Sequence, residues 1–309
     1  NELLFILIEN KQEIVNDYFD FVSSLAQQCF FNEYIFNKSK EENIKVKKLE
    51  SKILKSEKIN ELDIAILGCY MPLYNSKNII KKLSNYESNN FLFNDLIKVQ
   101  IKEPLNEIKI AKSINSFDKI VDNVSKKVRE QYEENPYPRW RYTYKNLSSN
   151  FLNHLNNEIK PNKLELNNEF NNPNILVAGC GTGQHIAIIA DKYLNSQILG
   201  IDLSLASLAY AKRKVEELNL KNVEFLQADI LQLKNLKKKF NVIECVGTLH
   251  HMKDPVAGLK ILLNLLEPNG LLKLGLYSEL ARQNIVKARN FIKRKNIKST
   301  VDEIRNFRE

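Results

Sequence analysis

The stretch NILVAGCGTGQHIA, residues 174–187, decides the fold class of this chain. A short apolar run leads into a turn with glycine at positions 179, 181 and 183, and a helical pattern follows. Glycine turns of this kind let the backbone approach a bound ligand closely. A dinucleotide-binding turn would place its last glycine at position 184, where this chain has glutamine. The turn therefore favours a ligand without a pyrophosphate.

The segments around this turn alternate between apolar runs of strand length and helical patterns. The strand-like runs cover residues 174–179, 196–202, 223–229, 240–247 and 270–277, and the helical patterns cover residues 183–194, 204–220 and 255–267. Such alternation predicts a mostly parallel sheet with helices on both faces. Sheets of this kind bind their ligands at the carboxyl ends of the strands.

Polar side chains stand at those predicted strand ends. Asp202 ends the second run, where an acid can accept hydrogen bonds from both hydroxyls of a ribose. Asp229 ends the third run and could accept a hydrogen bond from the amine of an adenine, with Ile230 packing on the ring. The paired His250 and His251 follow the fourth run. Each aspartate alone could be a helix N-cap, but the four strand ends together predict a nucleoside site. No carboxylate stands at metal-ligand spacing from the histidines, so no metal is expected.

Length and composition limit what the rest of the chain can be. With 309 residues, 43% of them apolar, the chain can form two domains with a sizeable core. Residues 1–115 carry apolar residues at helical spacing, with Asn60 as a candidate N-cap, and read as a helical domain. The longest apolar run is too short to span a membrane. The four scattered cysteines fit a reducing cytoplasm.

The net charge of +9 is concentrated near the end of the chain, because residues 280–309 carry 9 basic and 3 acidic side chains. A basic tail could bind nucleic acid, anionic lipid or an acidic protein. Lysines far outnumber arginines, and the tail carries no aromatic stripe beyond Phe291 and Phe307. Nucleic acid is therefore not the expected partner, and the tail reads as a solvated helix.

The glycine turn and the acidic strand ends together resemble the class I S-adenosylmethionine-dependent methyltransferases over residues 174–277. The resemblance implies S-adenosylmethionine as the cofactor. It also implies that the glycine turn lines the methionine part, that Asp202 binds the ribose and that Asp229 binds the adenine amine. The family usually has an acid two residues before the first glycine, where this chain has Val177. The contact to the methionine ammonium group would then come from elsewhere, or the cofactor would be held more weakly.

A closer similarity extends over the whole chain. The stretches VREQYEENPYPRW (128–140), ILVAGCGTGQH (175–185) and LGLYSELAR (274–282) are similar to one bacterial subfamily. It includes methyltransferases fused to tetratricopeptide repeats and rickettsial protein-lysine methyltransferases that modify an outer-membrane surface protein. The resemblance implies a homodimer that methylates accessible lysines of a protein. It divides the chain into a helical dimerisation domain (1–115), a connecting or lid segment (116–165), a cofactor-binding domain (166–280) and a basic helical tail that starts a truncated C-terminal region (281–309).

The stretch REQYEENPYPRW, residues 129–140, is predicted to fold over the cofactor as a lid. Arg139 or Arg129 would pair with the methionine carboxylate, because a guanidinium fork matches a carboxylate. The aromatic side chains would form a wall of the methyl-transfer channel: Tyr132, Tyr137 and Trp140. The alternative is a structural strap in which Trp140 is buried filler.

The predicted site is therefore specific by residue. The cofactor-binding prediction comprises Gly179, Cys180, Gly181, Gly183, Gln184, His185, Asp202, Leu203, Asp229, Ile230, Val246, Tyr132, Arg139 and Trp140. The candidates for a catalytic base are Tyr132, Glu244 and His251, although such an enzyme can work without one. Two alternatives stay open: a methyltransferase of the same fold that acts on RNA or a small molecule, and a dimeric cofactor-binding scaffold without activity.

Overall fold

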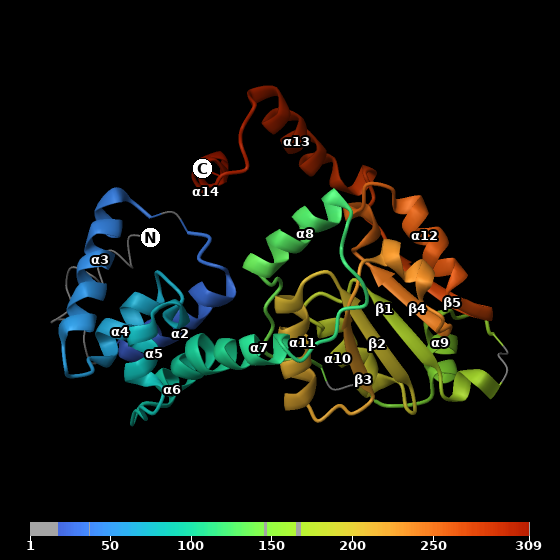
Figure 1. Cartoon of the computed structure of the whole chain (residues 1–309), viewed down its shortest axis with the longest axis horizontal. Helices are drawn as coiled ribbons and strands as arrows, with labels where there is room; N and C mark the ends of the chain where they lie inside the picture. The colour runs from blue at the N-terminus through green and yellow to red at the C-terminus, as the bar shows by residue number, and fades with distance from the viewer. Residues whose placement is uncertain (1–17, 37, 145–146, 165–167, 309) are drawn as a thin grey trace. The chain divides into compact units, whose positions relative to one another are not determined.

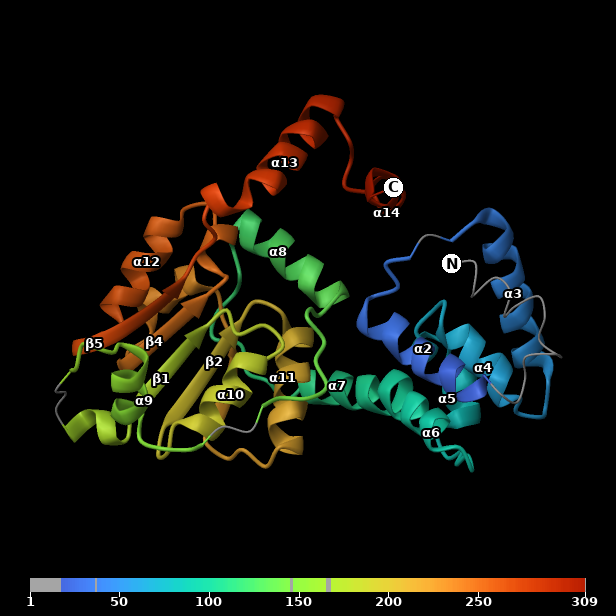
Figure 2. The same ribbon diagram turned by 180° about the vertical axis from the view of Figure 1, so that it is seen from behind.

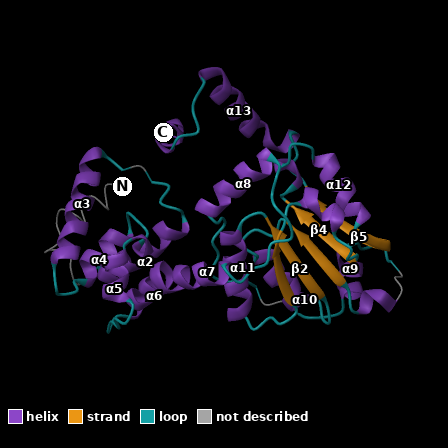
Figure 3. Cartoon of the chain, viewed as in Figure 1, coloured by secondary structure: helices purple, strands orange, loops and turns teal. Residues whose placement is uncertain are grey.

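The secondary structure changes along the chain where the apolar periodicity changes. The computed structural model describes residues 18–36, 38–144, 147–164 and 168–308 (Figure 1), so the first 17 residues of the predicted helical domain lie outside the described part. Within that part, every strand follows residue 173. Figure 3 shows the strands in orange. The chain divides into two units, one formed by residues 1–106 with 284–309 and the other by residues 107–283.

The first unit is helical, as predicted. Its helices are α2 (Phe19–Phe31), α3 (Lys40–Lys55), α4 (Glu61–Gly68), α5 (Lys77–Leu83) and α6 (Phe91–Ile97), with α13 (Gln283–Lys295) and α14 (Val301–Arg308) in the tail. Helix α7 (Glu103–Ala111) runs through the division between the units. The side chain of Asn60 accepts a hydrogen bond from the backbone N–H of Asp63, which confirms the predicted N-cap of α4. Tyr70 and Phe93 are among the largest fully buried side chains of this unit.

The second unit is built on a five-stranded parallel sheet in the order β3-β2-β1-β4-β5. Its strands are β1 (Asn174–Ala178), β2 (Gln197–Asp202), β3 (Val223–Gln227), β4 (Phe240–Val246) and β5 (Leu266–Gly275). Its helices are α8 (Asn123–Glu134), α9 (Phe151–Glu158), α10 (Gln184–Lys192), α11 (Leu205–Glu217) and α12 (Pro255–Asn264). These elements confirm the predicted alternation of strands and helices.

Helices cover both faces of the sheet, which Figure 1 and Figure 2 show from opposite sides. Alternate residues of a strand point to opposite faces. In β1, Leu176 packs into the cluster that includes Leu262 of α12. Its neighbour Ile175 packs into the cluster on the other face, with Ile186 of α10. All four side chains are fully buried, so β1 is apolar on both faces, as a central parallel strand must be.

The strand order places a topological switch beside β1. The chain proceeds from β1 to β2 and β3 on one side, and then crosses to β4 and β5 on the other. The loops that leave the carboxyl ends of β1 and β4 therefore run in opposite directions and leave a crevice between them. Ala178, Asp202, Gln227 and Val246 end their strands at this edge.

The segment 129–140 is helical in its first half and has no regular secondary structure in its second half. Residues up to Glu134 belong to α8, and regular secondary structure ends there. None of the helices in the described ranges is long and apolar enough to cross a membrane.

Candidate functional site

A cavity of about 340 Å³ opens at the carboxyl ends of the strands, within the second unit. This volume lies in the range of small-molecule sites. The cavity is lined by all of the predicted cofactor-binding residues except Gly183, Arg139 and Trp140. Of the candidate bases, Tyr132 and His251 line it, and Glu244 does not. The sheet topology thus brings together side chains from four strand ends and from the segment 129–140.

The glycine turn after β1 shapes one wall of this cavity. The backbone N–H groups of Gly179 and Cys180 both donate to the carbonyl of Ile201 on β2, at 2.9 Å each, which holds the turn against the neighbouring strand. Gly183 does not line the cavity. A side chain at Gly183 would lie 2.4 Å from the Cβ of Ala211, so its glycine serves the close packing of α10 on α11.

Asp202 connects the turn to the end of β2. One carboxylate oxygen accepts a hydrogen bond from the N–H of Gly181 at 2.9 Å, and the other accepts from the N–H of Ser204 at 3.0 Å. Burial raises the pKa of Asp202 above its ordinary value, and these backbone hydrogen bonds oppose that shift without cancelling it. The carboxylate is therefore fixed at the cavity edge, in the position from which a carboxylate could accept ribose hydroxyls.

Asp229 presents an unused acceptor to the cavity. Its Oδ1 accepts a hydrogen bond from the N–H of Leu231 at 3.0 Å and begins the short helix after β3. Its Oδ2 is buried and has no hydrogen-bond partner among the described residues. A buried acceptor of this kind costs free energy until a donor reaches it. Asp229 as a whole is only 3% exposed, and its carboxylate can thus accept a hydrogen bond from a donor that a ligand brings.

The last turn of α8 brings Tyr132 to the cavity. The carboxylate of its neighbour Glu133 accepts hydrogen bonds from the N–H groups of Leu205 and Ala206, at 2.7 and 3.0 Å. An acid at this place satisfies free N–H groups at the start of α11 and complements its dipole. Burial, with the nearby Asp202 carboxylate, raises the pKa of Tyr132, so its phenol stays protonated at neutral pH.

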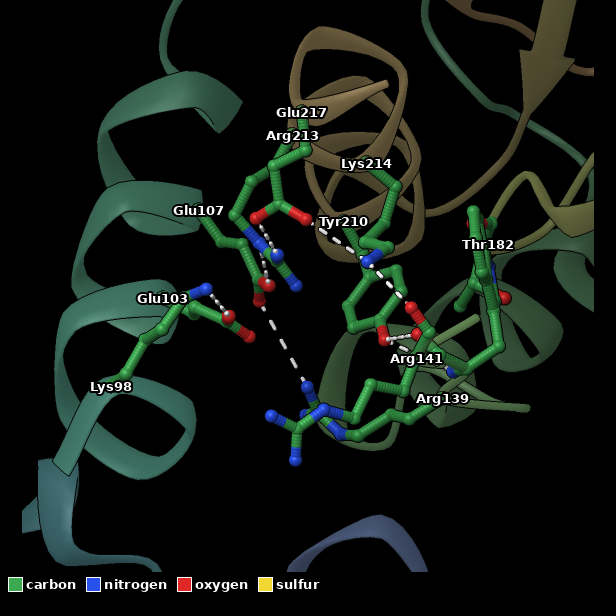
Figure 4. A network of polar contacts seen from close by, with 11 residues as sticks. Lys98, Glu103, Glu107, Arg139, Arg141, Thr182, Tyr210, Arg213, Lys214 and Glu217 are labelled. Carbon is green, nitrogen blue, oxygen red and sulfur yellow. Dashed lines mark hydrogen bonds and ion pairs between the residues drawn. The ribbon is translucent and has the colours of Figure 1, made fainter. Parts of the chain in front are cut away.

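Arg139 and Trp140 lie outside the cavity, which corrects their predicted placement. The indole N–H of Trp140 donates to the carbonyl of Thr182 at 2.8 Å, and the ring is only 6% exposed. The guanidinium of Arg139 lies 3.9 Å from the carboxylate of Glu107, which also accepts a hydrogen bond from Arg213 at 2.8 Å (Figure 4). Both side chains fasten the segment to the domain, because their polar groups find partners there.

The structure also adds residues that are not among the predicted cofactor-binding residues. Gly247, Thr248 and Met252 follow β4 directly and line the cavity beside Val246 and His251. The rule that strand ends form the site would have found them, since they lie within a few residues of a strand end. His250 does not line the cavity, and its ring contacts that of Tyr277, with centroids 4.2 Å apart.

Two glycines of the turn differ in what they permit. A Cβ at Gly179 would lie 2.2 Å from the Oγ1 of Thr248 and 2.8 Å from its Cβ, whereas a Cβ at Gly181 would meet nothing within 4 Å. Both have positive φ, +74° and +53°, which costs an alanine about 1–2 kcal/mol. Gly181 therefore leaves open space where the cavity approaches the backbone.

We expect Gly179→Ala to lower the free energy of unfolding by about 2–5 kcal/mol, because overpacking against Thr248 adds to the backbone strain. Gly181→Ala should lose only about 1–2 kcal/mol, but its methyl group would occupy ligand space. Urea unfolding of both variants measures the difference. Equal destabilisation of the two variants would contradict the different surroundings of the two glycines.

A family model matches part of this chain, and the proteins similar to it include two bacterial relatives and a solved structure. Residues 169–306 match the family described as "Methyltransferase domain" (Methyltransf_31). An uncharacterized protein of Synechococcus is 36% identical over 114 residues, which is 37% of this chain and 27% of that protein. An uncharacterized protein of Rickettsia prowazekii is 30% identical over 152 residues, 48% of this chain and 58% of that protein. PKMT2 from Rickettsia typhi in complex with AdoHcy is 32% identical, with a TM-score of 0.32, over 33% of this chain and 20% of that one. The chain thus spans less than two thirds of these relatives' length.

The parallel sheet, with its site at the switch beside β1, defines a Rossmann-like domain. The family match over residues 169–306 and this fold together indicate a methyltransferase domain with S-adenosylmethionine as its cofactor. The predicted fold class and cofactor are confirmed. The site fits this cofactor, since the unpaired Oδ2 of Asp229 can accept an amine and open space lies beside Gly181 and Gly247.

Proposed function

We propose that this protein transfers methyl groups from S-adenosylmethionine to lysine side chains of a protein, as the resemblance of the whole chain to protein-lysine methyltransferases implies. The observation that carries the proposal is the composition of the cavity wall. Tyr132, Tyr137 and His251 contribute rings to it, and no lysine or arginine is among its lining residues in the described part of the chain. Aromatic faces attract an ammonium group and exclude water.

The residues at the strand ends would hold the cofactor. Asp229 would accept the adenine amine at Oδ2, Ile230 would pack against the ring, and Asp202 would accept the ribose hydroxyls. The glycine turn would lie along the methionine part. When bound, S-adenosylmethionine supplies a methyl group on a positively charged sulfur. An amine displaces this sulfur from the methyl carbon by in-line attack.

The remaining task of the protein is to position and deprotonate the lysine amine. A lysine has an ordinary pKa of about 10.4, so its neutral form is scarce in water at neutral pH. Removing water from around the ammonium group lowers this pKa. The rings of Tyr132 and Tyr137 would provide that desolvation and hold the amine in line with the methyl group. His251 lines the same cavity and would accept the proton there, whereas Glu244 is only 1% exposed and does not line it.

The test is to incubate the protein with methyl-labelled S-adenosylmethionine and a bacterial outer-membrane protein fraction, with total RNA as a competing acceptor. Mass spectrometry should find the label on the Nζ atoms of lysines. Label found only on RNA or on small molecules would overturn the lysine proposal and leave the methyltransferase domain in place.

We expect Tyr132→Ala to lower kcat/KM for lysine methylation by at least about 10-fold, because both a cation–π contact and water exclusion are lost. Tyr142→Ala is the matched control. Tyr142 is 78% exposed and does not line the cavity, so its loss should leave kcat/KM unchanged. Equal effects of the two variants would show that the aromatic wall does not act on the substrate.

The resemblance also supports a homodimer formed through residues 1–115, which we include in the proposal. Sedimentation equilibrium of the chain measures it, and a monomer at micromolar concentration would contradict it.

A further inference from the structure

One buried carboxylate beside the cavity has no part in the function proposed above. Glu244 lies within β4 and is 1% exposed. In the register of the sheet it is the direct neighbour of Val177 on β1. Neighbours in register on parallel strands point to the same face, so the carboxylate of Glu244 lies beside the side chain of Val177. A carboxylate at such a depth is costly unless a partner stabilises it.

His185 is that partner, and it connects Glu244 to the cavity. Its Nε2 contacts the Glu244 carboxylate directly, and its ring, on the first turn of α10, lines the cavity. When Nε2–H donates to the carboxylate, Nδ1 keeps a lone pair that can accept a hydrogen bond. The carboxylate also fixes the orientation of the ring, as carboxylates do for metal-binding histidines. Glu244 can thus act on a ligand through His185, although it does not reach the cavity itself.

The sheet order shows at which end of the cavity the pair stands. Asp229 and Ile230 follow β3, which is an outer strand of the sheet. They line the end of the cavity where the nucleoside is predicted to bind. His185 and Glu244 stand on the other side, where β1 meets β4. With no lysine or arginine lining the described cavity, the charge that Glu244 places behind His185 makes this end suited to a cation.

We propose that His185 and Glu244 together hold the α-ammonium group of the cofactor's methionine part. His185 Nδ1 accepts a hydrogen bond from the ammonium group, and the buried charge of Glu244 attracts it. The pair fills the function for which Val177 has no polar group. This inference rests on the assignment of S-adenosylmethionine as the cofactor. His185 contacts the cofactor, and Glu244 is a positioning residue.

The test compares three ligands by calorimetry: S-adenosylhomocysteine, its analogue with hydrogen in place of the α-amino group, and 5′-methylthioadenosine, which lacks the whole amino-acid part. We expect Glu244→Gln to weaken binding of S-adenosylhomocysteine by about 10- to 100-fold, as for the loss of a charge-assisted hydrogen bond. The affinities for the other two ligands should change by less than about 2-fold, since neither carries the ammonium group. Glu224→Gln, at an exposed carboxylate on β3, is the matched control and should change none of the affinities.

A second pair of variants guards against a change in folding. His185→Ala should show the same selective loss for S-adenosylhomocysteine. His185→Gln keeps an N–H for Glu244 and an oxygen for the ligand, and should recover most of the affinity. Circular dichroism and thermal unfolding identify any variant that fails to fold.

Each outcome bears on a different claim. If the wild-type protein binds none of the three ligands, the cofactor assignment fails. If it binds them and the Glu244 and His185 variants weaken all three equally, the pair is structural and the inference is wrong. Unchanged binding of S-adenosylhomocysteine in folded variants would overturn it as well.

Discussion

Asp229→Asn is expected to weaken binding of S-adenosylhomocysteine by about 10- to 150-fold, the equivalent of about 1.5–3 kcal/mol for a hydrogen bond to a charged group. Asparagine can keep its oxygen on the N–H of Leu231, the partner of Oδ1 in the wild-type protein. Its amide nitrogen then replaces the unpaired Oδ2. This places a donor opposite the donor of an adenine amine, so the variant loses an attraction and gains a repulsion.

The same geometry predicts a change in base preference. S-inosylhomocysteine presents an oxygen where adenine has its amine, so the Asp229→Asn variant should bind it at least as well as S-adenosylhomocysteine. Wild-type protein should prefer the adenine compound. Calorimetry with both ligands measures the exchange, with Glu224→Gln as the control at an exposed carboxylate. An unchanged preference in the variant would show that Asp229 does not face the base.

Trp140→Ala is expected to lower the free energy of unfolding by about 3–5 kcal/mol, the usual cost of removing a buried tryptophan. The indole packs edge-to-face on Tyr210, with ring centroids 6.3 Å apart, and its N–H donates to Thr182. The backbone N–H of Trp140 also donates to the hydroxyl of Tyr210 at 3.0 Å. The hydroxyl of Thr182 donates to the carbonyl of Pro138 at 2.6 Å. Removing the indole leaves a cavity at the point where the segment 129–140 is fastened to α11 and the glycine turn.

Tyr137→Ala is the matched control, because Tyr137 belongs to the same segment, is 62% exposed and lines the cavity. Urea unfolding should show a change within about 0.5 kcal/mol for Tyr137→Ala, as for other exposed positions. The affinity of the Tyr137→Ala variant for a ligand of the cavity should fall instead. A loss below about 1 kcal/mol for Trp140→Ala would mean that the indole is not part of the packing that holds the segment.

Much of the fold was predictable because it depends on patterns that are local in the sequence. The apolar runs at 174–179 and 240–247 are strands in the structure, since both of their faces are buried between helices. The cap at Asn60 was also predictable, because its hydrogen bond reaches only three residues along the chain. Patterns of this length do not depend on which distant elements meet.

The residues of the candidate site also differ in how far the sequence could place them. Asp202 and Asp229 could be placed from the sequence because the carboxyl ends of parallel strands share one edge of a sheet. The segment 129–140 gave no such rule. In the structure, Tyr132 and Tyr137 line the cavity. Arg139 and Trp140 are close to them in sequence, but they do not line it and contact Glu107 and Thr182 instead.

The sequence by itself therefore determined the parallel sheet, the glycine turn and the acids at the strand ends, since each follows from local periodicity and chain order. Only the tertiary structure decided which side chains of the segment 129–140 face the cavity. It alone also brought Glu244 next to Val177 and onto His185. The register between β1 and β4 joins residues 67 positions apart, and it is set by packing across the whole sheet rather than by any stretch that can be read in isolation.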